Sequence, residues 1–342
     1  MIGKQTVLAL VVWLAFGGPA IADSQYQVVA ASEQYYAELS QNFHADVSSR
    51  VEATLALGQY QGANALIGIA RASRDLNPDL RIAAIQAVRQ WSDLAKWDVV
   101  SPLLADEVES VKRAAVYALL PLRHLLNAEQ SAYVDRQTES YLNRLDDHPQ
   151  SLLEKAQLNS LMTRYAEAEA FYTALLVSEH DAVFARALTV AYSQFLLQQQ
   201  RASDAVTHLE AVLLSQTEQP TFSDSQQASI HYQLGIAYLK TGRSEAATMQ
   251  FETAHTLDSN QPQYLYTYAT ALQAKQPERA ATLFLQLYDA TQDPRSLYAT
   301  CQSQLMAAMD ASSCISALRT MAPADVADTL VNQYSTPQTD NK

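Results

Sequence analysis

The side chains best suited to metal binding or nucleophilic chemistry in this sequence are seven histidines and two cysteines. No histidine pair has the H-E-x-x-H spacing of a zinc site, and no two histidines lie one helical turn apart. The C-x-x-C-H motif that attaches c-type haem is absent, as are G-x-S-x-G and G-x-G-x-x-G. The sequence therefore predicts no catalytic centre, no metal and no cofactor. Surface or packing positions are expected for His44, His124, His148, His180, His208, His231 and His255.

The composition indicates a helical protein with an acidic surface. The net charge is −13, which argues against binding to nucleic acids or anionic membranes. Ala, Leu, Gln and Glu are abundant, glycines number only 8 in 342 residues, and no long run alternates β-branched with polar residues. These features predict an all-α fold.

Residues 1–22 have the pattern of a secretory signal. Lys4 supplies the charged start, an apolar run covers 6–16, and Ala20 and Ala22 are the two small residues of a small-x-small cleavage site. The alternative, a membrane anchor, needs about 20 apolar residues, which is more than this run contains. We therefore expect a mature chain of net charge −14 in the periplasm of a Gram-negative bacterium, with no membrane span after cleavage.

The clearest structural pattern lies at 228–261, where two helices are predicted on either side of a short turn. Gly235 in the first helix and Ala247 in the second are small enough to let the helices approach closely. Tyr238 and Phe251 fill the space on either side of that contact. This spacing resembles the 34-residue tetratricopeptide repeat (TPR), whose units must stack on neighbours to bury their apolar faces.

Related units surround the central one, and the polar stretch 220–227 interrupts them as a predicted insertion. The predicted TPR array covers 148–323. Its units are 149–182, 186–219, 228–261, 262–295 and a degenerate pair at 296–323.

A second pattern, with a period of 31 residues, covers 48–126. Arg50, Arg81 and Lys112 occupy equivalent positions, with alanines three residues after each. A partner helix is expected to run through Pro102. The pattern resembles HEAT repeats, in which a basic residue and small residues recur at fixed places in one helix.

Asn127 and Gln130 form a predicted capping box at the start of a helix expected to run to Leu145. The complete prediction is a right-handed α-solenoid of HEAT-like repeats followed by TPRs. Its parts are a signal peptide at 1–22, a lead-in at 23–47, HEAT-like repeats at 48–147, the TPR array at 148–323, and a C-terminal helix and disordered tail at 324–342.

The TPR resemblance implies that the first helix of each unit lines a concave groove that binds a partner. The lining is neutral and partly aromatic, so we expect an apolar helix or extended segment of a protein as ligand. The alternative is that Tyr232 and Tyr266 only pack against the next repeat. The groove positions are Gln157, Ser160, Val190, Gln194, Leu197, Tyr232, Ile236, Leu239, Tyr266, Thr270 and Gln273.

Cys301 and Cys314 both lie in the last predicted helix pair, nearly opposite each other on the TPR template. An oxidising compartment favours a disulfide between them, provided that their Cα atoms approach within about 7 Å. The alternative is a pair of buried thiols. A catalytic thiol is not expected, because no histidine lies nearby in the sequence.

HEAT-like repeats that lead into TPRs resemble the C-terminal half of certain periplasmic multihaem cytochromes c, in the segment from Ala95 to Leu120 and again from Pro149 onward. The haem-bearing domain of that family is absent, so the resemblance implies a haemless docking or assembly partner of a cytochrome or respiratory complex. Two alternatives stay open: a chaperone for outer-membrane proteins, and an enzyme with a site built across repeats.

Overall fold

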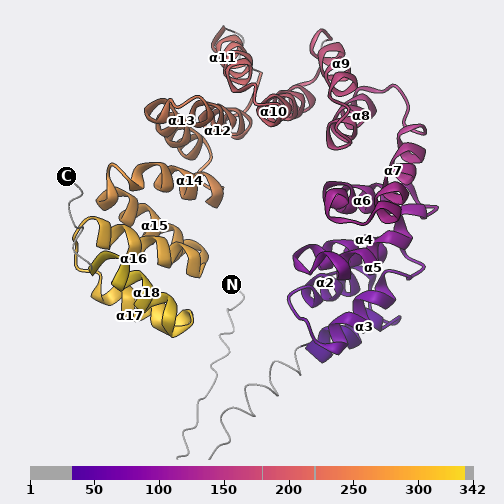
Figure 1. Cartoon of the computed structure of the whole chain (residues 1–342), viewed down its shortest axis with the longest axis horizontal. Helices are drawn as coiled ribbons and strands as arrows, with labels where there is room; N and C mark the ends of the chain where they lie inside the picture. The colour runs from indigo at the N-terminus through magenta and orange to yellow at the C-terminus, as the bar shows by residue number, and fades with distance from the viewer. Residues whose placement is uncertain (1–32, 179, 219–220, 336–342) are drawn as a thin grey trace, which may run out of the picture. The chain divides into compact units, whose positions relative to one another are not determined.

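The structure is a computed structural model, and every regular element among its described residues is a helix (Figure 1). This confirms the predicted all-α fold of helical repeats. The predicted signal at 1–22 lies outside the described residues, and so does the end of the predicted tail at 336–342. The structure describes residues 33–178, 180–218 and 221–335.

The chain divides into two compact units, with unit 1 ending at Leu145 and unit 2 beginning at Asp146. Unit 1 contains a helix at 33–41 followed by α2 (Val47–Leu57), α3 (Ala63–Ala72), α4 (Pro78–Ala87), α5 (Asp93–Val100), α6 (Glu109–Leu119) and α7 (Ala128–Leu142).

The basic residues of the 31-residue pattern lie inside unit 1, where α2 packs on α4 and α4 on α6. Arg50 on α2 binds Asp75 at 2.5 Å. Arg81 on α4 binds Asp106 through two hydrogen bonds of 2.8 and 3.0 Å. Asp75 and Asp106 are themselves 31 residues apart, and each lies in the loop before the next long helix. Each basic side chain thus ties one repeat to the loop that begins the next.

Two expectations about unit 1 need correction. The partner helix does not pass through Pro102: α5 ends at Val100 and the chain continues as a 3₁₀ helix over Ser101–Ala105. Proline lacks the N–H that an α-helix needs at this point. The capping box at Asn127 is present, but α7 ends at Leu142, one turn earlier than predicted.

Unit 2 is a row of antiparallel helix pairs in which consecutive helices are in contact. The helices are α8 (Pro149–Leu161), α9 (Tyr165–Leu176), α10 (Ala182–Gln198), α11 (Ala202–Glu218), α12 (Asp224–Lys240), α13 (Ser244–Leu257), α14 (Pro262–Gln273), α15 (Pro277–Thr291), α16 (Pro294–Met306), α17 (Ser312–Met321) and α18 (Ala324–Ser335).

The central pair, α12 and α13, has the packing that its small residues predict. Gly235 and Ala247 are buried, and the fully buried ring of Phe251 lies against Gly235. A Cβ atom added at Gly235 would come within 2.7 Å of the Phe251 Cδ1 atom. Only glycine at this position allows the two helices their observed distance.

The polar stretch at 220–227, predicted as an insertion, is helical in its second half, because 224–227 form the first turn of α12. Ser223 caps this helix by accepting a hydrogen bond from the Gln226 N–H, and the Gln226 Oε1 atom accepts one from the Ser223 N–H. The same extra turn occurs in α10, which begins four residues before the predicted start at 186 and is capped by Asp181.

The buried apolar side chains of unit 2 form two clusters. The larger extends from Leu153 on α8 to Ala299 on α16. The smaller joins α16, α17 and α18 and includes Leu318. A disulfide between Cys301 and Cys314, with Cα atoms 5.4 Å apart, crosslinks α16 to α17 inside the smaller cluster.

Candidate functional site

A cavity of about 430 Å³ opens in unit 2 where α14, α16 and the start of α18 come together. Three of the predicted groove residues meet here: Tyr266, Thr270 and Gln273 follow one another at helical spacing along one face of α14. We call this space the C-terminal cavity. Its other principal lining residues are Tyr298 and Gln302 from α16 and Val326 from α18.

Tyr266 presents its ring to the C-terminal cavity and is 42% exposed. The ring is held edge-on against Phe284 of α15, with centroids 5.5 Å apart. An exposed aromatic ring with a fixed orientation is well suited to binding an apolar side chain, because little conformational freedom is lost when the ligand arrives.

Carboxamide groups form the polar side of the cavity. Gln273 Nε2 donates to Gln302 Oε1 at 3.2 Å and to Ser303 Oγ at 2.9 Å. Gln302 Nε2 in turn donates to the Tyr334 hydroxyl at 3.2 Å, which connects α18 to α16. Gln273 Oε1 has no hydrogen-bond donor among the described residues, so it can accept a bond from a ligand amide.

A neighbouring cavity of about 330 Å³ shares Tyr266 and Arg295 with the C-terminal cavity. Arg295 is bound to Asp293, with a shortest distance of 2.7 Å. The Arg295 guanidinium and backbone N–H hold the pKa of the Asp293 carboxyl below its usual value. Among the described residues that line the C-terminal cavity, Arg295 is the one basic side chain, and Asp293 already neutralises its charge.

Tyr232 packs against the next repeat. Its hydroxyl accepts a hydrogen bond from Gln263 at 2.9 Å. Its ring lies 5.1 Å from Tyr264 and 5.7 Å from Phe251, centroid to centroid. These contacts join α12 to α13 and α14, so Tyr232 serves the stacking of the repeats.

Leu239 lies in a separate cavity of about 490 Å³ with residues of α13 and α14, among them the exposed Met249. At this cavity Tyr268 donates its hydroxyl to Glu252 at 2.7 Å, and Arg279 binds the same carboxylate at 2.7 Å. Burial, followed by the bond to Glu252, raises the pKa of Tyr268 to about 12. The structure therefore does not bring Leu239 together with Tyr266.

The other predicted groove residues are not brought into the C-terminal cavity. Ser160 is buried and donates to Gln198 Oε1 at 3.2 Å. Leu197 and Ile236 are half-buried against the larger apolar cluster. Of the rest, Gln157 and Val190 are half-buried and Gln194 is exposed.

Sequence reasoning missed the contribution of α18 and of Tyr298 to the site. The helix at 324–342 was expected, but its position against α16 depends on contacts that no local pattern encodes. Gln302 and Tyr334, which make one of those contacts, are 32 residues apart.

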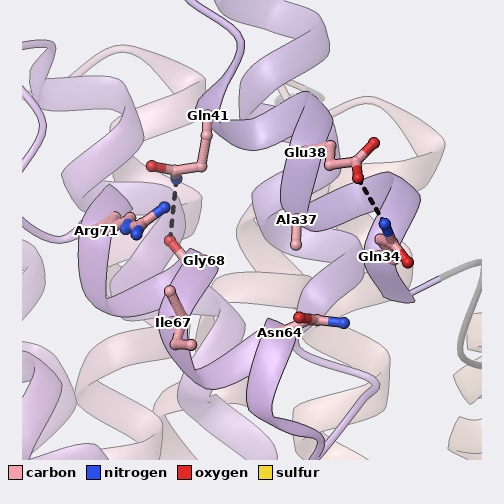
Figure 2. A pocket seen from close by; sticks show the side chains of 8 residues that line it. All are labelled: Gln34, Ala37, Glu38, Gln41, Asn64, Ile67, Gly68 and Arg71. Atoms are coloured by element: carbon pink, nitrogen blue, oxygen red, sulfur yellow. Dashed lines mark hydrogen bonds between the residues drawn. The ribbon is translucent and has the colours of Figure 1, made fainter.

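Unit 1 has a cavity of its own, of about 530 Å³, between the helix at 33–41 and α3 (Figure 2). Each helix contributes four lining residues at the same spacing, and the second set follows the first by 30 positions. The sets are Gln34, Ala37, Glu38 and Gln41 from the first helix, and Asn64, Ile67, Gly68 and Arg71 from α3. Gln41 Nε2 donates to the Gly68 carbonyl at 3.3 Å across the cavity, and Gln34 donates to Glu38 at 2.7 Å. The lining is mostly polar, so this cavity is less suited to an apolar anchor.

The histidines form no site. Within 33–178, 180–218 and 221–335, no three potential ligands among His, Cys, Asp and Glu gather as a metal would require. His208 Nε2 and His255 Nδ1 are buried without a hydrogen-bond partner. Burial lowers the pKa of both imidazoles, which favours their neutral forms.

Comparison with known proteins gives no relative that defines a family for this chain. No family model matches it, and no curated protein matches it. Among solved structures, the apo form of RapI has 14% identity and a TM-score of 0.46, covering 92% of each chain. A monomeric IFIT1 mutant with m7Gppp-AAAA has 13% identity and a TM-score of 0.43, covering 92% of this chain and 78% of that one. Likenesses at this level assign neither a family nor a ligand.

Among the helices that the structure describes, none is both long and apolar enough to cross a membrane.

Proposed function

We propose that this chain is a protein-interaction scaffold that binds a segment of a partner protein in the C-terminal cavity and catalyses no reaction. The observation that carries this proposal is the cavity itself, where the exposed Tyr266 ring and apolar walls lie beside the free acceptor of Gln273. An apolar side chain buried there gains about 25 cal/mol per Å² removed from water. A backbone N–H of the segment can then donate to Gln273 Oε1, which fixes its position.

We further propose that the scaffold works in the periplasm. Two features support this location: the signal-like pattern of residues 1–22, and the Cys301–Cys314 disulfide, because disulfides persist in oxidising compartments. The sequence resemblance to the repeat half of multihaem cytochromes c suggests a cytochrome or respiratory complex as partner. A chaperone for outer-membrane proteins is the second candidate.

A pull-down from periplasmic extract, read by mass spectrometry, tests the proposal. The bait is the mature chain, compared with Tyr266→Ala and with Tyr165→Ala. Tyr165 is the matched control, because it is 41% exposed on α9 and lies away from the cavity. We expect a partner that is retained by the wild type and by Tyr165→Ala and is lost with Tyr266→Ala.

The identity of the partner chooses between the two candidates. A haem protein supports docking to a cytochrome system, and unfolded β-barrel precursors support the chaperone. Identical partner sets for all three baits would show that the C-terminal cavity is not the binding site.

A further inference from the structure

The cavity of unit 1 has opposite charges in its two walls. Arg71 lines it from α3, and Glu38 lines it from the helix at 33–41. Figure 2 shows the two side chains on opposite sides of the cavity. Both are exposed, and neither has an ion-pair partner among the described residues. The cavity therefore holds a cation and a carboxylate that do not neutralise each other.

Hydrogen bonds hold the polar groups around these charges in place. Gln34 Nε2 donates to Glu38 Oε1 at 2.7 Å, which leaves the second carboxylate oxygen available. Gln41 Nε2 donates to Ser40 Oγ at 3.2 Å and to the Gly68 carbonyl at 3.3 Å. Both amide hydrogens of Gln41 are thus used, and its Oε1 atom remains as an acceptor for a ligand.

Asn64 adds a second available carboxamide, two turns before Arg71 on α3. It has no hydrogen-bond partner among the described residues, so it can both donate to a ligand and accept from it. The volume of about 530 Å³ lies within the range of about 300–1,000 Å³ that is typical of small-ligand sites. The lining matches a ligand that carries a carboxylate, an ammonium and amide groups of its own.

We propose that the cavity of unit 1 binds a short peptide with free termini. The C-terminal carboxylate of the peptide pairs with Arg71, and its N-terminal ammonium pairs with Glu38. The amide groups between the termini bond to Asn64 and to Gln41 Oε1. An amino acid carries both charges on one carbon atom, so the wider separation in a dipeptide or tripeptide suits walls that face each other. The inference concerns unit 1 and does not rest on the function proposed above.

The size of the charge effect follows from the exposure of Arg71 and Glu38. An exposed ion pair is worth about 0.2–1 kcal/mol, which is roughly a 1.4- to 5-fold change in affinity. Removing both terminal charges of the peptide should therefore weaken binding by about 2- to 30-fold. The loss should shrink with added salt, because the screening length falls from about 8 Å at 0.15 M to about 3 Å at 1 M.

Equilibrium dialysis with radiolabelled alanine, dialanine and trialanine tests this inference on the mature chain. Both peptides are also supplied with an amidated C-terminus or an acetylated N-terminus, and each cap removes one charge. The protein variants are Arg71→Gln and Glu38→Gln. The matched controls are Arg74→Gln and Glu52→Gln, because Arg74 and Glu52 are exposed residues of unit 1 that do not line the cavity.

We expect the peptides with free termini to bind more tightly than alanine and than their capped forms. Amidation should weaken binding to the wild type and to both controls, but not to Arg71→Gln. Acetylation should do the same for every protein except Glu38→Gln. Equal binding of free and capped peptides would overturn the inference, and so would a Kd above about 1 mM for all of them. Cap effects that survive both substitutions would place the peptide elsewhere and overturn it as well.

Discussion

The contact between Gly235 and Phe251 gives the sharpest test of how the repeats pack. Replacing Gly235 with alanine places a methyl group against a ring that is 0% exposed, at 2.7 Å from its Cδ1 atom. Carbon atoms prefer about 3.5–4.0 Å, so the ring or the helix must move by roughly 1 Å. Such overpacking costs about 1–3 kcal/mol.

An opposing term comes from the helix itself, because alanine is favoured over glycine inside a helix by about 1 kcal/mol. Gly235→Ala should therefore lower the free energy of unfolding by about 0–2 kcal/mol in the wild type. In a Phe251→Leu background the clash is relieved, and the same change should raise the free energy of unfolding by about 1 kcal/mol. The expected coupling between the two sites is about 1–3 kcal/mol.

The measurement is urea unfolding of the wild type, Gly235→Ala, Phe251→Leu and the double variant. Unfolding is followed by circular dichroism and analysed on the transition of unit 2. Gly242→Ala is the matched control. Gly242 has φ +77° and open space around it, so alanine there costs about 1–2 kcal/mol through backbone strain alone. Phe251→Leu should not rescue that loss. A coupling below about 0.5 kcal/mol at Gly235 would refute the packing of α12 on α13.

Three further predictions concern other parts of the chain. Replacing Cys301 and Cys314 by alanine should cost about 3 kcal/mol, because the bridge closes a loop with a sequence separation of 13, and calorimetry can measure the loss. Burial lowers the pKa of His208, so its stabilising effect is complete above about pH 6.5 and is lost as pH falls; wild type should lose more stability than His208→Leu between pH 7 and pH 5. Arg81→Met leaves the carboxylate of Asp106, which is 11% exposed, without its partner and should cost up to about 3–5 kcal/mol in urea unfolding, whereas adding Asp106→Asn should recover part of the loss.

Local patterns predicted the parts of the fold that depend on neighbours in sequence. The small residues at 235 and 247 identified the α12–α13 pair, and the capping box at Asn127 marked the start of α7. The start of α12 after the predicted insertion has the same kind of local signal. Ser223 and Gln226 form a capping box of the same kind, and its spacing was legible in the sequence.

The site was less predictable, because it depends on which side chains the stacking of repeats leaves free. Tyr232 and Tyr266 occupy equivalent positions in consecutive units, and the template treats them alike. The difference lies in the next helix: Gln263 and Tyr264 engage Tyr232, whereas Tyr266 contacts Phe284 and stays exposed. The repeat period predicts which face of the helix a side chain lies on. The residues of the next helix determine whether that side chain stays exposed to a partner.

The C-terminal cavity lies between two separately packed parts of unit 2. Each repeat is supported by its neighbours, and the α16–α17 pair packs against the single helix α18. The cavity lies where the two apolar clusters meet, with Phe284 of the larger cluster and Leu318 of the smaller one in its walls. The Cys301–Cys314 bridge crosslinks α16 to α17 within the smaller cluster. The covalent bond thus supports the α16–α17 wall of the candidate site.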